Sequence, residues 1–439
     1  MSFLEEARWK GFFALDALKG GKALKAYRSM DEAYRYGTSR HDTEKKLRSI
    51  IGEAVKNTGF YSKFPADAAL EDLPVVNKDI YRERYDEFLS KAYENKKGCR
   101  VMSTSGSTGT PFSVVQDPGK IACDQAGGAF LGALAGYRIG MRMAFLRVWV
   151  SNVKKSRLRL FAENMIMADT SDLSDEGIKK LLAMFRDEGV KAVVGYASAL
   201  TEISRYMERT GADGTPLGLC AIIPISESMP SAVREKLQEQ FGCPVMSWYS
   251  NEENGIMGVQ RPGSEEYYID TSSYVYEILK PDEDVPVKPG EVGRVVITDL
   301  NNKAFPMLRY DTGDMAREHL QVSGERYRLY LSEIFGRRSD TIYDVNGNAL
   351  SSYVITNNLW NIEGVKQYRF IQLDETHYEL RLNTGGKKAD ENEILGRILK
   401  YFGEGAKIDI VYVDEIPVLA SGKRKHVENR CEKYVGGRR

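Results

Sequence analysis

The stretch Ser103-Thr104-Ser105-Gly106-Ser107-Thr108-Gly109-Thr110-Pro111 is the starting point for predicting the fold. It lies between the apolar pair Val101-Met102 and the β-prone segment 112–115, so the pattern predicts a loop that joins two strands. Glycines allow consecutive backbone N–H groups to converge on one point, and Ser and Thr add hydroxyl donors, so such a loop can bind an anion such as a triphosphate. A flexible surface loop is the plainer alternative. The Gly-Lys-Ser/Thr ending of a Walker loop is absent.

Further motifs follow along the chain: Tyr249-Ser250-Asn251-Glu252-Glu253, Tyr310-Asp311-Thr312-Gly313-Asp314, Gly336-Arg337-Arg338-Ser339-Asp340 and Pro417-Val418-Leu419-Ala420-Ser421-Gly422-Lys423. Together with the glycine-rich stretch, this ordered set resembles the core motifs of the acyl-adenylate-forming (AMP-binding) superfamily. The resemblance is greatest to the branch of the phenylacetate-coenzyme A ligases and the capsule-synthesis proteins. It extends from about Leu73 to the end of the chain, and the whole ordered set is far more specific than any one motif.

The resemblance implies that the glycine-rich loop holds the β- and γ-phosphates of ATP through Thr104, Ser105, Gly106, Ser107, Thr108 and Gly109. The family loop often ends in a lysine after the proline, whereas Phe112 follows Pro111 here, so the expected phosphate cradle lacks one positive charge. Glu253 matches the carboxylate that binds magnesium in the family, with Glu252 as the adjacent alternative. Tyr249 is expected against the adenine or the phosphates.

The resemblance also implies contacts to the nucleoside. The segment Ser226-Glu227 would face the adenine, although Ser226 or Ser228 could instead cap the helix that follows. Asp314 would accept hydrogen bonds from both ribose hydroxyls, because two carboxylate oxygens match two neighbouring hydroxyl donors; a β-turn acid is the alternative. Arg337 would contact the ribose or a phosphate as a fixed cation.

The last two motifs imply a mobile C-terminal domain. The hinge position of the family aligns with Ser339, and Asp340 is the nearest acid, so either residue could be the pivot. In Ser421-Gly422-Lys423 a glycine turn would place Lys423 in the active site, where its charge meets the substrate carboxylate and the α-phosphate. The alternative is a basic tail that is solvated or binds nucleic acid.

Length and periodicity predict an α/β protein of two domains. Residues 1–338 are expected to form the N-terminal ATP- and acid-binding domain, with a helical lead-in at 1–97, and residues 339–439 a small, mobile α+β domain that carries the catalytic lysine. Between 143 and 249 short strands alternate with helices, which predicts a largely parallel sheet whose last strand is 244–249. After Arg261, strands within 267–279, 293–300 and 315–331 predict a smaller β-rich unit.

Composition argues against several classes of protein. The chain of 439 residues contains 42% hydrophobic and 28% charged residues, which is typical of a folded globular protein. Lys plus Arg and Asp plus Glu both number 62, so no overall field attracts nucleic acid or anionic lipid. The five cysteines are scattered, and we expect a reducing cytoplasm. We expect neither a signal peptide nor a membrane span, and the aromatic helix around 9–16 should pack inward.

These inferences lead to one expected function and two alternatives. We expect formation of an acyl-adenylate with ATP and Mg²⁺, followed by transfer of the acyl group to a thiol, most simply coenzyme A. An amine acceptor on a sugar or another metabolite is the first alternative, and a non-catalytic nucleotide-binding protein is the second. The acid should be a small monocarboxylate with an aromatic or medium-sized apolar body, bound among Tyr137, Tyr196 and Trp248. The sequence predicts no oligomeric state.

Overall fold

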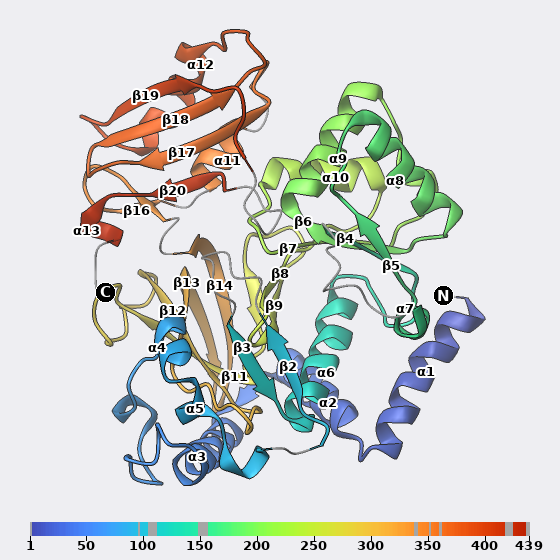
Figure 1. Cartoon of the computed structure of the whole chain (residues 1–439), viewed down its shortest axis with the longest axis vertical. Helices are drawn as coiled ribbons and strands as arrows, with labels where there is room; N and C mark the ends of the chain where they lie inside the picture. Colours follow the sequence, from blue (N-terminus) through green and yellow to red (C-terminus); the bar gives the residue numbers. More distant parts are fainter. Residues whose placement is uncertain are drawn as a thin grey trace.

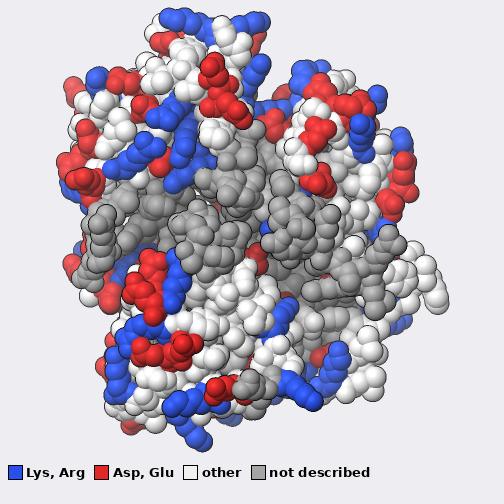
Figure 2. Space-filling model, viewed as in Figure 1, with Lys and Arg blue, Asp and Glu red and all other residues white. Residues whose placement is uncertain are grey.

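The computed structural model describes residues 2–94, 97–103, 112–147, 157–337, 341–350, 353–359, 362–417 and 425–435. In Figure 1 these residues form a helical lead-in, a parallel and an antiparallel sheet with their helices, and a C-terminal lobe, so the predicted α/β class is confirmed. On the face shown in Figure 2, Lys and Arg are interspersed with Asp and Glu. No helix in the described ranges is long and apolar enough to cross a lipid bilayer.

Helices dominate the lead-in, as predicted. Asn77 caps α4, because its Oδ1 accepts hydrogen bonds of 3.0 Å from two backbone N–H groups of the first turn. The aromatic face of α1 packs inward, where Trp9 and Phe13 contact Tyr27 of α2. The helices are α1 (Phe3–Leu18), α2 (Lys22–Tyr36), α3 (Arg40–Asn57), α4 (Lys78–Glu83) and α5 (Tyr85–Phe88), with short 3₁₀ turns at Leu70–Asp72 and Lys91–Tyr93.

Four parallel strands form the sheet that the alternation of strands and helices predicted, in the order β5-β4-β6-β7. Every residue of β6 is buried, which explains its continuous apolar run. The prediction that 244–249 is the last strand of this sheet is wrong. Val245 makes only an isolated bridge to Ile222, and the chain then enters β8 (Trp248–Asn251) of the antiparallel sheet. The other elements are β4 (Met143–Arg147), α7 (Arg157–Glu163), β5 (Met165–Asp169), α8 (Asp175–Asp187), β6 (Ala192–Tyr196), α9 (Ala197–Thr210), a 3₁₀ turn (Thr215–Leu217), β7 (Ala221–Ile225) and α10 (Ser231–Phe241).

The antiparallel sheet is the largest sheet of the described chain, not the smaller unit predicted after Arg261. Its order is β11-β12-β13-β14-β10-β9-β8, and β1 pairs with β14. The segment 315–331 is a hairpin rather than one strand, and it turns at Gly324, whose φ of 58° suits glycine. The remaining strands are β1 (Thr38–Ser39), β9 (Gly255–Gln260), β10 (Tyr267–Ile269), β11 (Tyr274–Leu279), β12 (Val292–Asp299), β13 (Tyr310–Ser323) and β14 (Arg326–Arg337).

The glycine-rich stretch is flanked by two strands, as predicted. β2 (Arg100–Ser103) and β3 (Ser113–Gln116) pair antiparallel, and residues 104–111 lie outside the described chain. After β3, α6 (Pro118–Leu134) begins at its N-cap Asp117 and packs against α2 and β9. Small residues permit this approach, since a Cβ on Gly127 would lie 3.7 Å from the backbone oxygen of Ile256.

The C-terminal lobe has its own sheet, in the order β19-β18-β17-β20, and its own apolar core around Phe370, Tyr378 and Phe402. Asn346-Gly347 forms the predicted hairpin turn between β15 and β16. The predicted boundary at Ser339 lies outside the described residues, so the division into two domains stays a prediction. The elements are β15 (Ile342–Tyr343), β16 (Ala349–Leu350), α11 (Tyr353–Leu359), β17 (Gln367–Gln372), β18 (His377–Asn383), α12 (Glu391–Ile398), a 3₁₀ turn (Leu399–Tyr401), β19 (Lys407–Tyr412), β20 (Val427–Asn429) and α13 (Glu432–Val435).

Candidate functional site

Several predicted site residues lie beyond the carboxyl ends of the parallel strands, where ligands bind in α/β sheets. β6 ends at Tyr196, and β7 ends directly before Ser226-Glu227. Burial raises the pKa of Tyr196, the guanidinium of Arg147 lowers it, and the carboxylates of Glu227 and Glu252 raise it, so charges from three other segments act on this phenol. Ser226 has a left-handed φ of 69°, a conformation that costs a non-glycine residue about 1 to 2 kcal/mol and that recurs at functional sites.

Glu227 makes a contact that the sequence did not predict. Its Oε2 accepts a hydrogen bond of 2.9 Å from the backbone N–H of Ser198, in the first turn of α9. The alternative role, a serine cap on α10, is wrong, because Pro230 is the N-cap of that helix and makes no side-chain cap bond. Glu227 therefore joins the end of β7 to the beginning of α9.

The turn between β8 and β9 distinguishes Glu253 from Glu252. Glu253 is 4% exposed, whereas Glu252 faces solvent. The backbone N–H of Asn254 donates to Asn251 Oδ1 at 2.7 Å, and Gln116 Nε2 donates to the Glu253 carbonyl at 3.5 Å. These bonds hold the turn so that the Glu253 carboxylate points into the protein.

A buried cation that sequence analysis missed holds the same turn. Lys120 of α6 is fully buried and donates to the Asn254 carbonyl at 2.7 Å, and its Nζ lies 3.0 Å from Asp124 and 2.8 Å from Asp299. Burial lowers the pKa of Lys120, but the two carboxylates outweigh burial, so its pKa lies well above the usual value. A lysine in a helix is normally exposed, and the sequence therefore carried no signal for this contact.

Two further groups contact the Glu253 carboxylate. Lys78 Nζ lies 2.6 Å from Glu253 Oε1, and the hydroxyl of Tyr310 donates to the same oxygen at 3.2 Å. Burial, followed by the charge of Glu253, raises the pKa of Tyr310 well above its usual value, so this phenol remains a donor. Sequence analysis missed Lys78, because it precedes Glu253 by 175 residues and belongs to no motif.

Residues of three motifs meet where β8 faces the β13–β14 hairpin. The hydroxyl of Tyr249 donates to Asp314 Oδ2 at 2.9 Å, and Asp314 lies opposite Arg337 in the ladder. Burial, followed by the negative charge of Asp314, raises the pKa of Tyr249 well above its usual value. The alternative role considered for Asp314, a carboxylate that stabilises a turn, belongs to Asp311 instead. Its Oδ1 accepts a hydrogen bond of 2.9 Å from the Gly313 N–H. The carboxylate of Asp314 contacts Tyr249 instead.

Two aromatic residues that we predicted to line an acid pocket meet at α6. A Cβ on Gly132 would lie 3.0 Å from Tyr137 Cδ1 and 3.6 Å from Trp248 Cζ2, so glycine lets both rings approach the helix. Within the described chain, Trp248 Nε1 is buried and has no hydrogen-bond partner, which is unusual for a buried donor. Phe130, on the same helix, packs against Tyr27 of α2 and belongs to the core.

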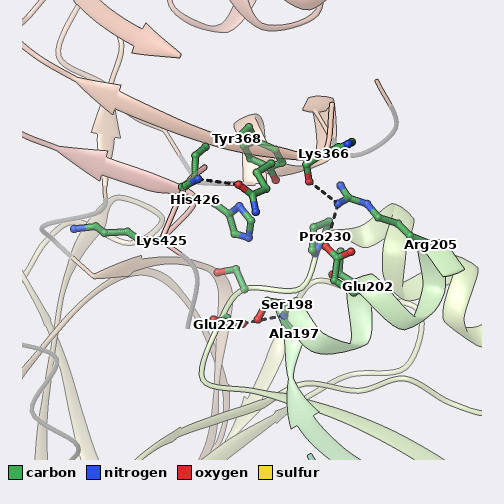
Figure 3. Close-up of a pocket in the computed structure, with 14 residues that line it drawn as sticks. Ala197, Ser198, Glu202, Arg205, Glu227, Pro230, Lys366, Tyr368, Lys425 and His426 are labelled. Atoms are coloured by element: carbon green, nitrogen blue, oxygen red, sulfur yellow. Dashed lines mark hydrogen bonds and ion pairs between the residues drawn. The ribbon is translucent and has the colours of Figure 1, made fainter. Parts of the chain in front are cut away.

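A narrow pocket lies between these segments and the C-terminal lobe (Figure 3). Its volume is 30 Å³, which is room for only a few water molecules. Arg205 of α9 spans the pocket, since its Nη1 donates to the Lys366 carbonyl at 3.3 Å. The lining includes Ser198, Glu202, Glu227 and Pro230 on one side and Tyr368, Lys425 and His426 on the other.

Other predicted residues lie outside the described chain. These are Thr104, Ser105, Gly106, Ser107, Thr108, Gly109, Ser339 and Lys423. Of Arg337 the structure describes the backbone alone. The roles that the resemblance implied for these residues therefore stay predictions.

Known proteins resemble this chain over most of its length. Residues 342–430 match the family model of the CapK C-terminal domain. Protein CapK of Staphylococcus aureus is 23% identical over 406 residues, which cover 88% of this chain and 86% of that protein. Phenylacetate-coenzyme A ligase of Thermus thermophilus is 26% identical over 318 residues, which cover 68% and 70% of the two chains. The crystal structure of a 2-hydroxyisobutyryl-CoA ligase in its postadenylation state has a TM-score of 0.68 at 17% identity and 90% coverage of both chains, a likeness that shows the shared fold.

The ordered motifs and these relatives make the chain similar to the acyl-adenylate-forming superfamily, and the solved ligase shows the same fold. Within that superfamily, the chain is similar to the branch that contains the phenylacetate-coenzyme A ligases and CapK.

Proposed function

We propose that this protein uses ATP to convert a carboxylic acid into an acyl-adenylate and then transfers the acyl group to a thiol, most simply that of coenzyme A. The observation that carries the proposal is the convergence of two separate motifs, one with Tyr249 and Glu253 and the other with Tyr310 and Asp314. Tyr310 links them, because it donates to Glu253 and its pKa responds to the charges of Glu253 and Asp314. The naming of relatives as phenylacetate-coenzyme A ligases supports the same class of reaction.

In the first step an oxygen of the substrate carboxylate bonds to the α-phosphorus of ATP, and the bond to the departing pyrophosphate breaks. Negative charge grows on the phosphates, so the site needs donors and cations rather than a protein nucleophile. Asp314, oriented by the Tyr249 hydroxyl, would accept from the ribose hydroxyls. The donors of residues 104–109 would hold the β- and γ-phosphates, and Lys423 would meet the α-phosphate and the carboxylate.

Glu253 fits a magnesium ligand. Mg²⁺ prefers oxygen ligands and is usually held by one or two carboxylates together with substrate phosphates. Within the described chain no group of three or more His, Cys, Asp or Glu could form a complete protein cage, so a site shared with ATP is the arrangement that Glu253 suits. When bound there, the metal would neutralise part of the phosphate charge.

The second step is proposed to follow a rotation of the C-terminal lobe about Ser339, which would withdraw Lys423 and admit the acceptor. In the present arrangement the pocket between the lobe and α9 has a volume of 30 Å³, which is room for only a few water molecules. The contact between Arg205 and the Lys366 carbonyl would have to open before an acceptor entered there. The thiol sulfur would then bond to the acyl carbon, and AMP would leave.

The acid is proposed to be a monocarboxylate with an aromatic or medium-sized apolar body. Tyr137 and Trp248 offer apolar surface beside α6, and the unpartnered Trp248 Nε1 offers a donor for an oxygen of the acid. An amine acceptor on a sugar or another metabolite stays the alternative, which the acceptor assay below tests.

The test is ATP–pyrophosphate exchange with a panel of arylacetates, arylcarboxylates, aliphatic acids, dicarboxylates and amino acids. Exchange with arylacetates or arylcarboxylates is the expected result. Dicarboxylates or amino acids that outperform them by more than about tenfold, the factor that 1.4 kcal/mol represents, would reject the proposed acid. The best acid is then incubated with coenzyme A or with amino sugars, and product mass identifies the acceptor.

A further inference from the structure

Lys78 lies beside Phe112, the residue that follows the glycine-rich stretch in the sequence. Residues 103–111 contain no Lys or Arg, although a triphosphate carries several negative charges. Phe112 is the next residue, and Lys78 Nζ lies 5.5 Å from the centroid of its ring. Phe112, which follows this cation-free stretch in the sequence, is thus next to an ammonium group that comes from a different part of the chain.

The backbone before Lys78 is fixed to the strand β13. The Val76 N–H donates to the Arg309 carbonyl at 2.9 Å, and the Val76 carbonyl accepts from the Asp311 N–H at 3.0 Å. Asn77 then caps α4, so Lys78 is the first residue of that helix. The same strand that carries Asp314 therefore determines where this ammonium group lies.

Lys78 is also more accessible than its partner. Its side chain is 30% exposed, whereas that of Glu253 is 5% exposed. A lysine at the rim of a site can exchange one anion for another, because water and ligands reach it. Glu253 would keep the hydrogen bond from the Tyr310 hydroxyl during such an exchange.

We propose that Lys78 is a cation that binds the β- and γ-phosphates of ATP, and that it exchanges Glu253 for phosphate oxygens when the nucleotide binds. This inference rests on the proposed function. An ammonium group is a compact charge that suits phosphate oxygens. When the bond between the α-phosphorus and the bridging oxygen breaks, its electron pair stays on pyrophosphate, and Lys78 would stabilise that charge without transferring a proton.

The test compares ATP with AMP, which lacks the β- and γ-phosphates. Binding of each nucleotide in the presence of Mg²⁺ is measured by calorimetry for wild type, Lys78→Met and Lys78→Arg. Lys78→Met should weaken ATP binding about tenfold to a hundredfold, the range for losing a hydrogen bond to a charged group, and leave AMP binding unchanged. Lys78→Arg should retain most of the ATP affinity. Lys236→Met is the matched control, because Lys236 forms a 3.3 Å ion pair with Glu208 on the helices α9 and α10.

Two results would overturn the inference alone: an unchanged ATP affinity in Lys78→Met, or an equal loss of ATP and AMP binding. A wild-type protein that binds neither nucleotide would overturn the proposed function and this inference with it. If Lys78→Met does not fold, amine labelling of the wild-type protein, read by mass spectrometry, decides the question. ATP with Mg²⁺ should then protect Lys78 more strongly than AMP does, and equal protection would contradict the role.

Discussion

Glu253→Gln separates the proposed magnesium ligand from its neighbour, and the structure sets the size of the effect. The substitution removes one charge but keeps the shape, so the Tyr310 hydroxyl can still donate to the side chain. Breaking a fully buried ion pair costs about 3 to 5 kcal/mol, whereas an exposed pair is worth about 0.2 to 1 kcal/mol. Since Lys78 is 30% exposed and can return to water, we expect a loss of unfolding free energy of about 1 to 2 kcal/mol.

The functional effect of Glu253→Gln should be larger. The Mg²⁺ concentration for half-maximal ATP–pyrophosphate exchange should rise at least about tenfold. Loss of a residue that only orients a metal ligand already weakens metal binding by about tenfold or more, and Glu253 is the proposed ligand itself. Glu252→Gln is the matched control, because Glu252 loses the same charge one residue earlier but faces solvent. It should change stability by less than about 0.5 kcal/mol and leave the Mg²⁺ dependence unchanged. The reverse result, with Glu252→Gln raising the Mg²⁺ requirement and Glu253→Gln not, would refute the assignment.

Lys423→Ala should slow adenylate formation about a hundredfold to a thousandfold and spare thioester formation from supplied acyl-AMP; equal loss in both half-reactions would contradict its role. Asp314→Ala should weaken ATP binding in calorimetry without altering the choice of acid, and an unchanged affinity would count against the ribose contact. Lys120→Met should lower the unfolding free energy in denaturant titration by about 3 to 5 kcal/mol, because it removes the cation beside the buried Asp299 and one of the two cations beside Asp124; a loss below about 1 kcal/mol would show that the network is dispensable. Ser339→Pro should impair one half-reaction selectively, whereas uniform loss would indicate misfolding.

Local patterns were sufficient to predict most elements of the fold. Strand and helix periodicity placed β6, α9 and β7 within one or two residues, and the Asn77 cap and the Asn346-Gly347 turn formed as their side chains required. These features depend on neighbours in the sequence, so the sequence contains all the information. The β13–β14 hairpin was missed because both strands carry polar residues on an exposed face, which hides a turn at Gly324 inside a uniform pattern.

The ordered motifs likewise identified Tyr249, Glu253 and Asp314, but the amino-acid sequence could not show what holds them. Lys78 reaches Glu253 across 175 residues, and Lys120 becomes a buried cation because the fold brings Asp299 of β12 beside it, where Asp124 of its own helix also lies. Periodicity indicates which face of an element is buried, whereas the partner on that face depends on how the sheets and helices pack. A lysine is the same residue in the sequence whether its ammonium group lies in water or in the interior. Its location depends on the carboxylates that the fold brings beside it.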